Sequence, residues 1–343
     1  MTRALVRKAA KKPGKHSVKK SLNSATAFAP ATVANVAVGF DILGFAINGL
    51  GETACVEKIP SAKVILNPIE GYPEIPLEPH LNTATAGLLE LIKDQNLNFG
   101  FRVTLKKNIP MGSGLGGSST SAVAALVAAN ALLKKKLSME QLLHYALIGE
   151  QIASQSRHAD NVAPCLVGGM VLIHQNQGKK ISAKTSNSFF PIKIKSPKDL
   201  YCVIVLPEIS IKTSEARKIL SPQVPLASVI EQTRNLAGFI LGCEKSDFDL
   251  MGLSLKDAII ETQRSHLVPF FSDIQKSALA AGALGCSLSG SGPAMFALGK
   301  GPSKAVKIHK AMLAMAAQKN LPIKGSWVSR ISNRGARVIR GRG

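Results

Sequence analysis

The sequence predicts an α+β protein built from two domains. Stretches with the two-residue alternation of β-strands and stretches with helical spacing of apolar residues follow one another without regular strand–helix–strand repetition. The 343 residues are 45% hydrophobic, which suffices for two buried cores and is too apolar for a disordered chain. Each half carries a glycine- and serine-rich turn, at 110–121 and at 282–293. We place the boundary in the polar stretch 176–199, which we expect to be loop-rich, and this gives domains of residues 21–190 and 191–343.

The first part of the N-terminal domain is predicted to be mainly β. A basic arm, residues 1–20, precedes it and is expected to be disordered. Residues 21–57 are apolar and interrupted by glycines and by the turn signal Asn48-Gly49, a pattern typical of strands joined by tight turns. The proline- and glycine-rich stretch 67–82 is expected to be irregular, and residues 83–94 carry a helical stripe of apolar side chains.

The rest of this domain alternates between strands and helices. Residues 101–105 alternate between apolar and polar side chains, which predicts a strand before the first Gly/Ser-rich run. The Ala/Val/Leu-rich segment after that run predicts a helix to about residue 133. Ser138 is a suitable N-cap for a further helix over 139–154, and a strand is expected at 167–174.

The C-terminal half mixes both element types. Residues 201–206 form a short apolar run typical of a buried strand. Further strands are predicted at 295–298 and 327–331, and helices at 214–220, 226–241, 257–261, 272–281 and 303–318.

The net charge of +22 is concentrated at the two ends of the chain. Residues 1–20 contain eight Lys or Arg and residues 321–343 contain six, with no acid in either, which leaves +8 for the 300 residues between. Such ends either solubilise a protein or contact nucleic acid or anionic lipid. We favour a solvated tail, because one Trp and three Tyr give few of the aromatic residues that a nucleic-acid-binding surface interleaves with basic ones.

Cysteine usage and hydropathy indicate a cytoplasmic protein without membrane contact. The five cysteines are odd in number and widely spaced, with no Cys-x-x-Cys pair, which predicts free thiols in a reducing compartment. The longest apolar run, 121–133, is too short to span a bilayer, and the basic start lacks the apolar core of a secretory signal. An organelle address is the less favoured alternative.

The run 110–121 has the composition of a phosphate-binding loop. It reads Pro-Met-Gly-Ser-Gly-Leu-Gly-Gly-Ser-Ser-Thr-Ser, between a predicted strand and a predicted helix. Its glycines allow the backbone to approach a ligand closely, and the N-terminus of the following helix favours an anion. It lacks the Gly-Lys-Ser/Thr ending of a Walker A loop. A flexible hairpin is the alternative, and the strand–loop–helix context makes it the weaker one.

The pattern Pro-x-x-x-Gly-Leu-Gly-Gly-Ser-Ser resembles the ATP loop of the GHMP kinases, a superfamily of small-molecule kinases. The resemblance implies ATP as phosphoryl donor and also places Asn82 near the adenine. It assigns ATP binding within the loop to Pro110, Met111, Gly112, Ser113, Gly114, Leu115, Gly116, Gly117, Ser118, Ser119 and Thr120.

Glu150 is predicted to lie on the apolar face of the helix over 139–154. Apolar residues precede it by three, four and seven positions, so the carboxylate shares their stripe. This is costly unless the group is paired or binds a metal. A helix-end glutamate that reaches solvent or an arginine is the alternative. Mg²⁺ prefers carboxylate, hydroxyl and phosphate oxygens, which Glu150 with Ser118 or Ser119 would supply, and the homoserine kinase family has a Mg²⁺ ligand at the position that resembles Glu150.

Residues 156–164 read Ser-Arg-His-Ala-Asp-Asn-Val-Ala-Pro, which on composition alone indicates a turn. The string His-x-Asp-Asn-Val-Ala-Pro is similar to a homoserine kinase signature. The resemblance implies that Asn161 contacts the substrate and positions its hydroxyl. Asp160 is a candidate base whose alternative is a structural role, because phosphoryl transfer depends mostly on positioning and charge.

Asn35 and Asp41 are the only strongly polar residues of the apolar segment 29–44, so they need partners. Local turns beside Gly39 are one possibility, and the ammonium and hydroxyl of a ligand are the other. The segment resembles the N-terminal homoserine kinase motif, although many members have Gly-Pro-Gly-Phe-Asp where 37–41 of this chain read Ala-Val-Gly-Phe-Asp.

Homoserine, the substrate that the resemblance implies, carries a carboxylate and an ammonium. A site that binds it therefore needs a cationic and an anionic side chain. Arginine suits a carboxylate through paired hydrogen bonds. Arg217 ends a Thr-x-x-x-Arg string that resembles the one whose arginine faces the substrate in homoserine kinases. Arg264 matches a second such arginine less well, because Gln263 and the string Pro-Phe-Phe at 269–271 replace the family's Asp and Pro-Tyr-Arg. A surface ion pair is the alternative for either arginine.

The second Gly/Ser-rich turn, 282–293, resembles the C-terminal GHMP motif that packs against the nucleotide loop. The resemblance covers about residues 27–339. It implies an N-terminal domain like the second domain of ribosomal protein S5, a ferredoxin-like C-terminal domain and a homodimer. It also implies phosphorylation of the side-chain hydroxyl of L-homoserine to O-phospho-L-homoserine, a step of threonine biosynthesis, with ATP and Mg²⁺.

The resulting hypothesis assigns catalytic roles to Asn161, Arg217 and Asp160. It assigns substrate contacts to Asn35, Asp41, Asn161, Arg217 and Arg264. Two alternatives stay open: another GHMP kinase, acting on mevalonate, a sugar or an isoprenoid precursor, and a nucleic-acid-binding protein that uses its basic ends.

Overall fold

The computed structural model describes residues 22–154, 158–177 and 187–342, and it confirms the α+β class. The basic arm lies outside these residues. In the larger of two sheets the strands are β1 (Ser24–Ala34), β2 (Leu43–Ile59), β3 (Val64–Leu66), β4 (Gly100–Lys106), β5 (Met170–Gln177), β6 (Asn187–Ile194) and β11 (Arg337–Arg342). They run in the order β11-β1-β2-β4-β3, with β5 beside β2 and β6 beside β5.

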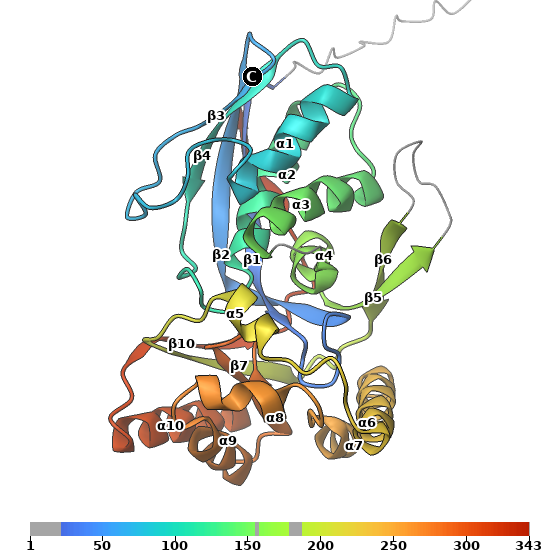
Figure 1. The fold of residues 1–343 in the computed structure, drawn as a ribbon, viewed down its shortest axis with the longest axis vertical. Helices are drawn as coiled ribbons and strands as arrows, with labels where there is room; N and C mark the ends of the chain where they lie inside the picture. Colours follow the sequence, from blue (N-terminus) through green and yellow to red (C-terminus); the bar gives the residue numbers. More distant parts are fainter. Residues whose placement is uncertain (1–21, 155–157, 178–186, 343) are drawn as a thin grey trace, which may run out of the picture.

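The smaller sheet lies in the other half of the molecule (Figure 1). Its strands are β7 (Leu200–Pro207), β8 (Gly285–Leu288), β9 (Met295–Lys300) and β10 (Ile323–Arg330). Their order is β10-β7-β9-β8, and all pairs are antiparallel.

Helices cover one face of each sheet (Figure 1). The larger sheet is covered by α1 (Thr83–Asp94), α2 (Gly117–Leu132), α3 (Met139–Ser154) and α4 (Ala159–Val167). The second half contains α5 (Thr213–Lys218), α6 (Leu226–Lys245), α7 (Phe248–Ser254), α8 (Glu261–Arg264), a 3₁₀ turn (Ser265–Leu267), α9 (Phe271–Ala280) and α10 (Pro302–Gln318). No helix in the described part of the chain is long and apolar enough to cross a membrane.

Three apolar cores hold these layers together. One lies between the larger sheet and helices α1–α4, and another between the smaller sheet and helices α9 and α10. The third joins the two halves, because Val33 and Phe45 of the larger sheet pack with Ile204 and Phe296 of the smaller one. Phe45 and Phe296 meet edge to face with ring centroids 6.3 Å apart. The two halves thus share a buried apolar core, and the candidate site is lined by residues of both.

Several predicted elements are confirmed. Helix α1 has its predicted bounds, and Asn82 caps it by accepting from the backbone N–H of Ala84 at 2.9 Å. Helix α3 begins after Ser138, whose hydroxyl accepts from the N–H of Gln141 at 3.2 Å. The Gln141 side chain accepts in return from the N–H of Ser138 at 2.9 Å. This is a capping box, which the sequence signal Ser-x-x-Gln specifies.

The predicted turn at Asn48-Gly49 is wrong, because β2 continues through both residues. Gly49 has a φ of +83°. The pairing with β1 shifts there, since Pro30 lies opposite Gly51 whereas Thr32 lies opposite Ala46. The turn signal is therefore accommodated as an irregularity in a long strand, held on both sides by its neighbours.

Other predictions fail where tertiary contacts decide the conformation. The stretch predicted to be loop-rich contains β6, which pairs with β5 over eight positions. The helix predicted at 257–261 is instead a turn, because the Asp257 side chain accepts from the N–H groups of Ile259 and Ile260. The run after α3, which composition assigns to a turn, forms α4 in its second part. Strands β3, β8 and β11 and helix α7 were not predicted.

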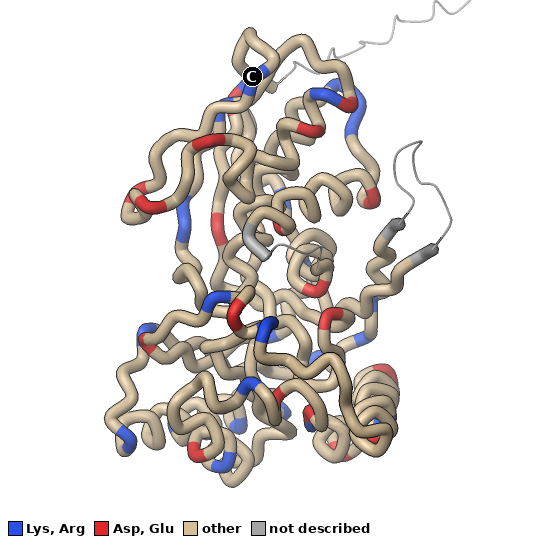
Figure 2. Tube along the Cα trace, in the orientation of Figure 1, with Lys and Arg blue, Asp and Glu red and all other residues tan. Residues whose placement is uncertain are grey.

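The predicted domain boundary at residue 190 stays a prediction. Strand β6 spans it, and β11 returns the chain to the larger sheet beside β1. Figure 2 shows acidic and basic positions interspersed over both halves of the described chain.

Candidate active site

The glycine-rich run forms an open turn between β4 and α2. Gly112, Gly114 and Gly116 have φ values of +65°, +78° and +72°, which glycine adopts without the strain other residues would incur. Gly116 is the N-cap of α2, and no described side chain caps this helix end. The first N–H groups of α2 are therefore left for an anion in the turn, as the sequence predicts.

The second Gly/Ser-rich turn packs directly against the first. The Ser289 hydroxyl donates to the carbonyl of Gly114 at 2.7 Å, and the N–H of Ala294 donates to the carbonyl of Ser113 at 3.0 Å. A Cβ at Gly114 would lie 2.4 Å from the backbone oxygen of Ser289. The second half of the chain thus supports the shape of the loop.

Replacing Gly116 with alanine is expected to distort this loop. The added Cβ would lie 2.2 Å from Thr32 Oγ1 and 2.9 Å from Asn161 Oδ1, at a positive φ. We expect kcat/KM for ATP to fall roughly 100-fold, because displacing a reacting group by about 1 Å has that effect. Steady-state kinetics would measure it. Gly49→Ala is the control, since it has a φ of +83° and no atom within 4 Å of the added Cβ, and a similar loss there would contradict the explanation.

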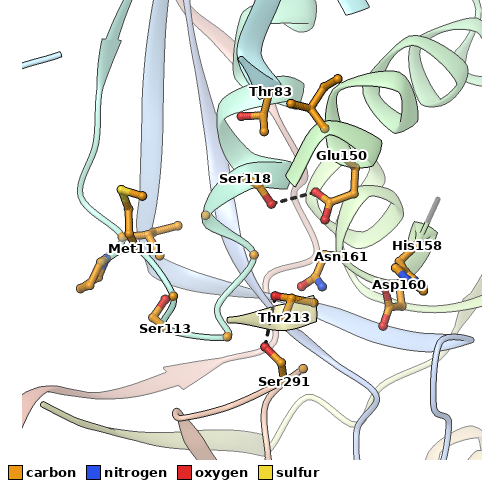
Figure 3. Close-up of a pocket in the computed structure, with 18 of the residues that line it drawn as sticks. Thr83, Met111, Ser113, Ser118, Glu150, His158, Asp160, Asn161, Thr213 and Ser291 are labelled. Atoms are coloured by element: carbon orange, nitrogen blue, oxygen red, sulfur yellow. Dashed lines mark hydrogen bonds between the residues drawn. The ribbon is translucent and has the colours of Figure 1, made fainter. Parts of the chain in front are cut away.

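A cavity of about 390 Å³ opens beside this loop and is lined from both halves of the chain. Figure 3 shows Ser118, Glu150, Asn161, Thr213 and Ser291 around it, from separate segments. The predicted residues that line it are Asn35, Asp41, Asn82, Pro110, Met111, Gly112, Ser113, Gly114, Gly116, Gly117, Ser118, Glu150, Asp160, Asn161, Arg217 and Arg264.

Three residues of the predicted ATP loop do not line the cavity. Leu115 is fully buried in the core between the halves. The Thr120 hydroxyl donates to the carbonyl of Gly117 at 2.9 Å within α2. Ser119 is also buried and faces Glu150. Their contribution is therefore to the shape of the loop and to the position of Glu150.

Glu150 lies near the end of α3, and its side chain contacts the first turn of α2. Its Oε2 accepts from the Ser118 hydroxyl at 2.9 Å and from the Ser119 hydroxyl at 2.7 Å. The residue is 7% exposed, and burial raises the pKa of its carboxyl although both hydroxyls and His158 favour the charged form. A buried carboxylate beside two hydroxyls is a donor set that suits Mg²⁺, and the glycine-rich turn lies next to it.

The described residues contain no group of three His, Cys, Asp or Glu side chains arranged around one metal position. Mg²⁺ does not need one, because it is commonly held by one or two carboxylates together with phosphate oxygens and water. The set of Glu150, Ser118 and Ser119 fits that pattern. The choice between the two serines stays open, since both hydroxyls reach the same carboxylate oxygen.

The two polar residues of the predicted signature lie in the first turn of α4. Asn161 Oδ1 accepts from the Thr32 hydroxyl at 2.6 Å, which leaves its NH₂ group as a donor at the cavity. Asp160 is 4% exposed, and its Oδ1 has no hydrogen-bond partner among the described residues. Burial and the nearby Asp41 carboxylate raise the pKa of Asp160 to about 7, against the influence of His158. A carboxyl with this pKa can either hold or accept a proton near neutral pH.

The segment before β2 is held in an unusual backbone conformation. Asn35, Val36 and Ala37 are consecutive residues with φ values of +68°, +48° and +57°. Such conformations are costly for residues other than glycine and persist only where surrounding contacts impose them. The Asn35 side chain supplies such contacts, because it donates to the carbonyl of Gly290 at 2.9 Å and accepts from the N–H of Asp41 at 3.1 Å. Both predicted possibilities for Asn35 are thus present, a local turn contact and a place at the cavity.

Asp41 forms a tight cluster with Arg217 and His158. Arg217 donates two parallel hydrogen bonds to its carboxylate, at 2.7 and 2.9 Å, and His158 Nδ1 lies 3.3 Å from it. Burial would raise the pKa of Asp41, but the bonds and charges of His158 and Arg217 outweigh it and lower the pKa to about 2. The Asp41 carboxylate and the Arg217 guanidinium thus lie side by side at the cavity. A zwitterionic ligand could take the place of each as the partner of the other.

His158 was not assigned a role from the sequence, although it lies in the matched string. Burial lowers its pKa, but the hydrogen bond and charge of Asp41 raise it above its ordinary value of 6.5. Its charged form therefore stabilises the fold fully below about pH 6.5, and this contribution is lost as pH rises through the higher pKa of the folded state. Asp160, whose pKa is also raised, acts in the same direction at lower pH, between its ordinary value of 3.8 and about 7.

We expect His158→Gln to flatten the upper part of the pH dependence of stability. Between pH 6.5 and 8.5 the melting temperature of the wild type should fall more than that of the variant. Thermal unfolding at a series of pH values would measure this. His266→Gln, at an exposed histidine, is the control and should follow the wild type. Equal slopes for His158→Gln and the wild type would contradict the prediction.

The second arginine also lies at the cavity. Arg264 is 3% exposed, and its Nε donates to the carbonyl of Ala216 at 2.8 Å. Its guanidinium and that of Arg217 lie 5.0 and 4.9 Å from the ring centroid of Phe40. Burial and the charge of Arg217 lower the pKa of Arg264 to about 10, which leaves it cationic at neutral pH. The weaker of the two sequence matches thus has the more buried arginine.

The far end of the cavity combines apolar and polar groups. Ile75, Pro76 and Met111 line it together with Asn82 and Thr83. The Asn82 amide donates to the carbonyl of Pro76 at 2.9 Å, in addition to capping α1. Its side chain therefore shapes this end. Thr83, Lys107, Thr213 and Ser291 also line the cavity and were not predicted. Thr213 and Ser291 lie inside strings that the sequence analysis matched, whereas Thr83 and Lys107 are single polar residues without a sequence signal of their own.

The chain matches two family models. Residues 82–169 match the N-terminal domain of the GHMP kinases, and residues 239–318 match the C-terminal GHMP kinase domain. The two matches contain the first and the second Gly/Ser-rich turn, respectively.

Individual relatives extend the similarity to nearly the whole chain. It is 39% identical over 318 residues to a homoserine kinase of Xylella fastidiosa strain M12, covering 92% of this chain and 94% of that protein. It is 40% identical over 321 residues to a homoserine kinase of Xanthomonas campestris pv. campestris strain B100, covering 93% and 95%.

Solved structures agree. A homoserine kinase from Cytophaga hutchinsonii superposes with a TM-score of 0.86 at 38% identity, over 96% of this chain and all of that one. A mevalonate kinase from L. major, solved with R-mevalonate, superposes with a TM-score of 0.64 at 17% identity over 91% of this chain and 98% of that one, which shows a shared fold only.

Proposed function

This chain belongs to the homoserine kinase family of the GHMP kinases, and on that premise we propose that it transfers the γ-phosphoryl group of ATP to the side-chain hydroxyl of L-homoserine. The product is O-phospho-L-homoserine, an intermediate of threonine biosynthesis. One observation supports this most directly: the paired Asp41 and Arg217 face the same cavity as the glycine-rich loop.

The phosphate chain of ATP is assigned to the loop and the N-terminus of α2. Gly112, Gly114 and Gly116 leave room for it, and the uncapped N–H groups of α2 favour its charge. The adenine is assigned to the end lined by Ile75 and Asn82. Mg²⁺, where bound, would be held by Glu150 with Ser118 or Ser119 and would neutralise charge on the phosphates.

Homoserine is assigned to the end lined by the charged cluster. Its carboxylate would replace Asp41 as the partner of Arg217, with Arg264 as a further cation, and its ammonium would take the Asp41 carboxylate. Asn161 would hold the hydroxyl through its NH₂ group. The contribution of Asn35 is to keep Asp41 in place through the hydrogen bond to its N–H.

The fate of the hydroxyl proton divides between two acceptors. Asp160 is close to the cavity and has a pKa of about 7, so it is a candidate base. The phosphoryl group itself is the other acceptor, since this reaction depends mainly on alignment and charge stabilisation. We assign positioning to Asn161 and Arg217 and keep Asp160 as the candidate base.

The setting of the enzyme is also part of the proposal. All five cysteines are free, and four of them are buried, which supports a reducing, cytoplasmic compartment. A homodimer is supported by exposed apolar side chains on α6 and α7, among them Leu226, Ile230 and Leu253. Light scattering during gel filtration would test the dimer.

Coupled ADP release tests the function. The full chain would be assayed with Mg-ATP and homoserine, mevalonate, galactose or shikimate as acceptor. We expect turnover with homoserine alone, lost in Asn35→Ala and Glu150→Ala. Turnover with a different alcohol and none with homoserine would overturn the substrate and the roles of Asp41 and Arg217, while leaving the kinase class.

A further inference from the structure

A buried ion pair flanks the glycine-rich loop. Glu52 belongs to β2, Lys107 directly follows β4, and Lys107 Nζ lies 2.9 Å from Glu52 Oε1. Their side chains are 1% and 6% exposed. Lys107 Nζ also donates to Ser121 Oγ at 3.0 Å, and the Ser121 hydroxyl donates to Glu52 Oε2 at 2.5 Å. The three side chains form a closed ring of hydrogen bonds that uses both carboxylate oxygens.

Two features of its surroundings oppose the charge of this ammonium, although Glu52 neutralises it. Ser121 lies in the second turn of α2, so Lys107 is beside the positive end of the helix dipole. Burial penalises its charge further, and a buried ion pair is on average no more stabilising than apolar residues of the same size. Stability alone is therefore a poor explanation for this pair.

The cavity supplies an explanation. Lys107 lines it together with Ile109, Pro110 and Met111, at the start of the loop. An ammonium has three N–H donors, and the contacts to Glu52 and Ser121 use two of them. The third has no hydrogen-bond partner among the described residues. Because Lys107 lines the cavity and the dipole of α2 attracts anions there, this donor is available to an anionic ligand.

We infer that Lys107 binds the phosphate chain of the nucleotide and that Glu52 is the residue that positions it. The inference rests on the proposed nucleotide site. Glu52 and Ser121 hold the ammonium at the edge of the loop, and the net charge of the ring stays near zero until phosphate binds. Lys107 then donates a charge-assisted hydrogen bond to the phosphate, in addition to the bonds that the N–H groups of α2 donate.

Nucleotide binding without acceptor tests this directly. Isothermal titration of the full chain with ATP, ADP and adenosine would compare wild type, Lys107→Met, Glu52→Gln and the double variant. Lys107→Met should raise Kd for ATP and ADP at least roughly tenfold, the value of one charge-assisted bond, and leave adenosine within about twofold. Glu52→Gln should raise Kd for ATP about threefold, because Lys107 keeps a neutral partner.

The double variant separates positioning from a merely structural role. If Glu52 acts through Lys107, adding Glu52→Gln to Lys107→Met should not weaken ATP binding further. The double variant also removes both buried charges, so it keeps the test open if Lys107→Met alone does not fold. Lys319→Met is the control. Lys319 also pairs with a carboxylate, that of Asp273 at 3.2 Å, but lies far along the chain from the loop. This variant should bind ATP as the wild type does.

Three results would overturn the inference. They are wild-type ATP affinity in Lys107→Met, an equal loss of ATP and adenosine binding, or an undiminished effect of Glu52→Gln in the Lys107→Met background, which would overturn the positioning role. A wild-type chain that binds ATP but does not phosphorylate homoserine would instead overturn the proposed function alone, since the binding comparison needs no acceptor.

Discussion

Glu150→Gln is expected to lower kcat by roughly two to three orders of magnitude while the protein stays folded. Glutamine has nearly the same shape and can still accept the bonds from Ser118 and Ser119, so the change removes the charge and little else. Loss of one well-placed electrostatic group in a closed site has an effect of that size. Steady-state kinetics with saturating homoserine and ATP would measure it.

The same substitution should raise stability above pH 4.5. Burial raises the pKa of the Glu150 carboxyl, so the charged group opposes folding at pH values above its ordinary pKa of 4.5, and glutamine removes this penalty. The melting temperature of the variant should exceed that of the wild type at pH 8 and approach it near pH 4. Glu140→Gln, at an exposed position in the first turn of the same helix, is the matched control for both measurements. A kcat within about threefold of wild type would contradict a role for this charge.

This trade-off explains why sequence reasoning found Glu150. A carboxylate in register with an apolar stripe is a local conflict, and such conflicts mark functional positions. The glycine-rich loop was found from its composition, because its glycines allow close approach to a ligand between a strand and a helix. The positive φ values of Gly112, Gly114 and Gly116 agree with this. Both signals come from residues close together in the sequence, and the structure places both at the cavity.

Long-range contacts explain what sequence reasoning missed. Strand β11 is defined by pairing with β1 about 300 residues away, and β6 by pairing with β5. The ring of Glu52, Lys107 and Ser121 joins β2, the end of β4 and α2 across 69 positions, so no spacing rule reveals it. The pairing of Asp41 with Arg217 spans 176 positions. The sequence motifs identify each residue separately, whereas their mutual neutralisation depends on how the two halves pack.

The pairing of Asp41 with Arg217 predicts a large effect of Asp41 substitution on homoserine binding. Asp41→Asn is expected to raise KM for homoserine at least about thirtyfold, the ratio that about 2 kcal/mol gives when one member of a charged pair is removed. KM for ATP should stay within about twofold, because Asp41 lies with Arg217 and His158 rather than with the glycine-rich loop. Asp273→Asn is the control, since Asp273 pairs only with Lys319 among the described ion pairs.

An acceptor without the amino group makes this prediction sharper. In the wild type, the carboxylate of 4-hydroxybutyrate can bind Arg217 only if the bonds between Arg217 and Asp41 break. Homoserine then offers its ammonium to Asp41 as a new partner. 4-Hydroxybutyrate has no ammonium, so Asp41 is left without a partner, which costs free energy. Asparagine removes that penalty and leaves Arg217 available. Asp41→Asn should therefore weaken homoserine and improve 4-hydroxybutyrate, so that the ratio of their kcat/KM values moves by more than either value does alone. A variant that loses activity on both acceptors equally would show that Asp41 shapes the site without binding the ammonium, because only a direct contact with that group can make the two acceptors respond in opposite directions.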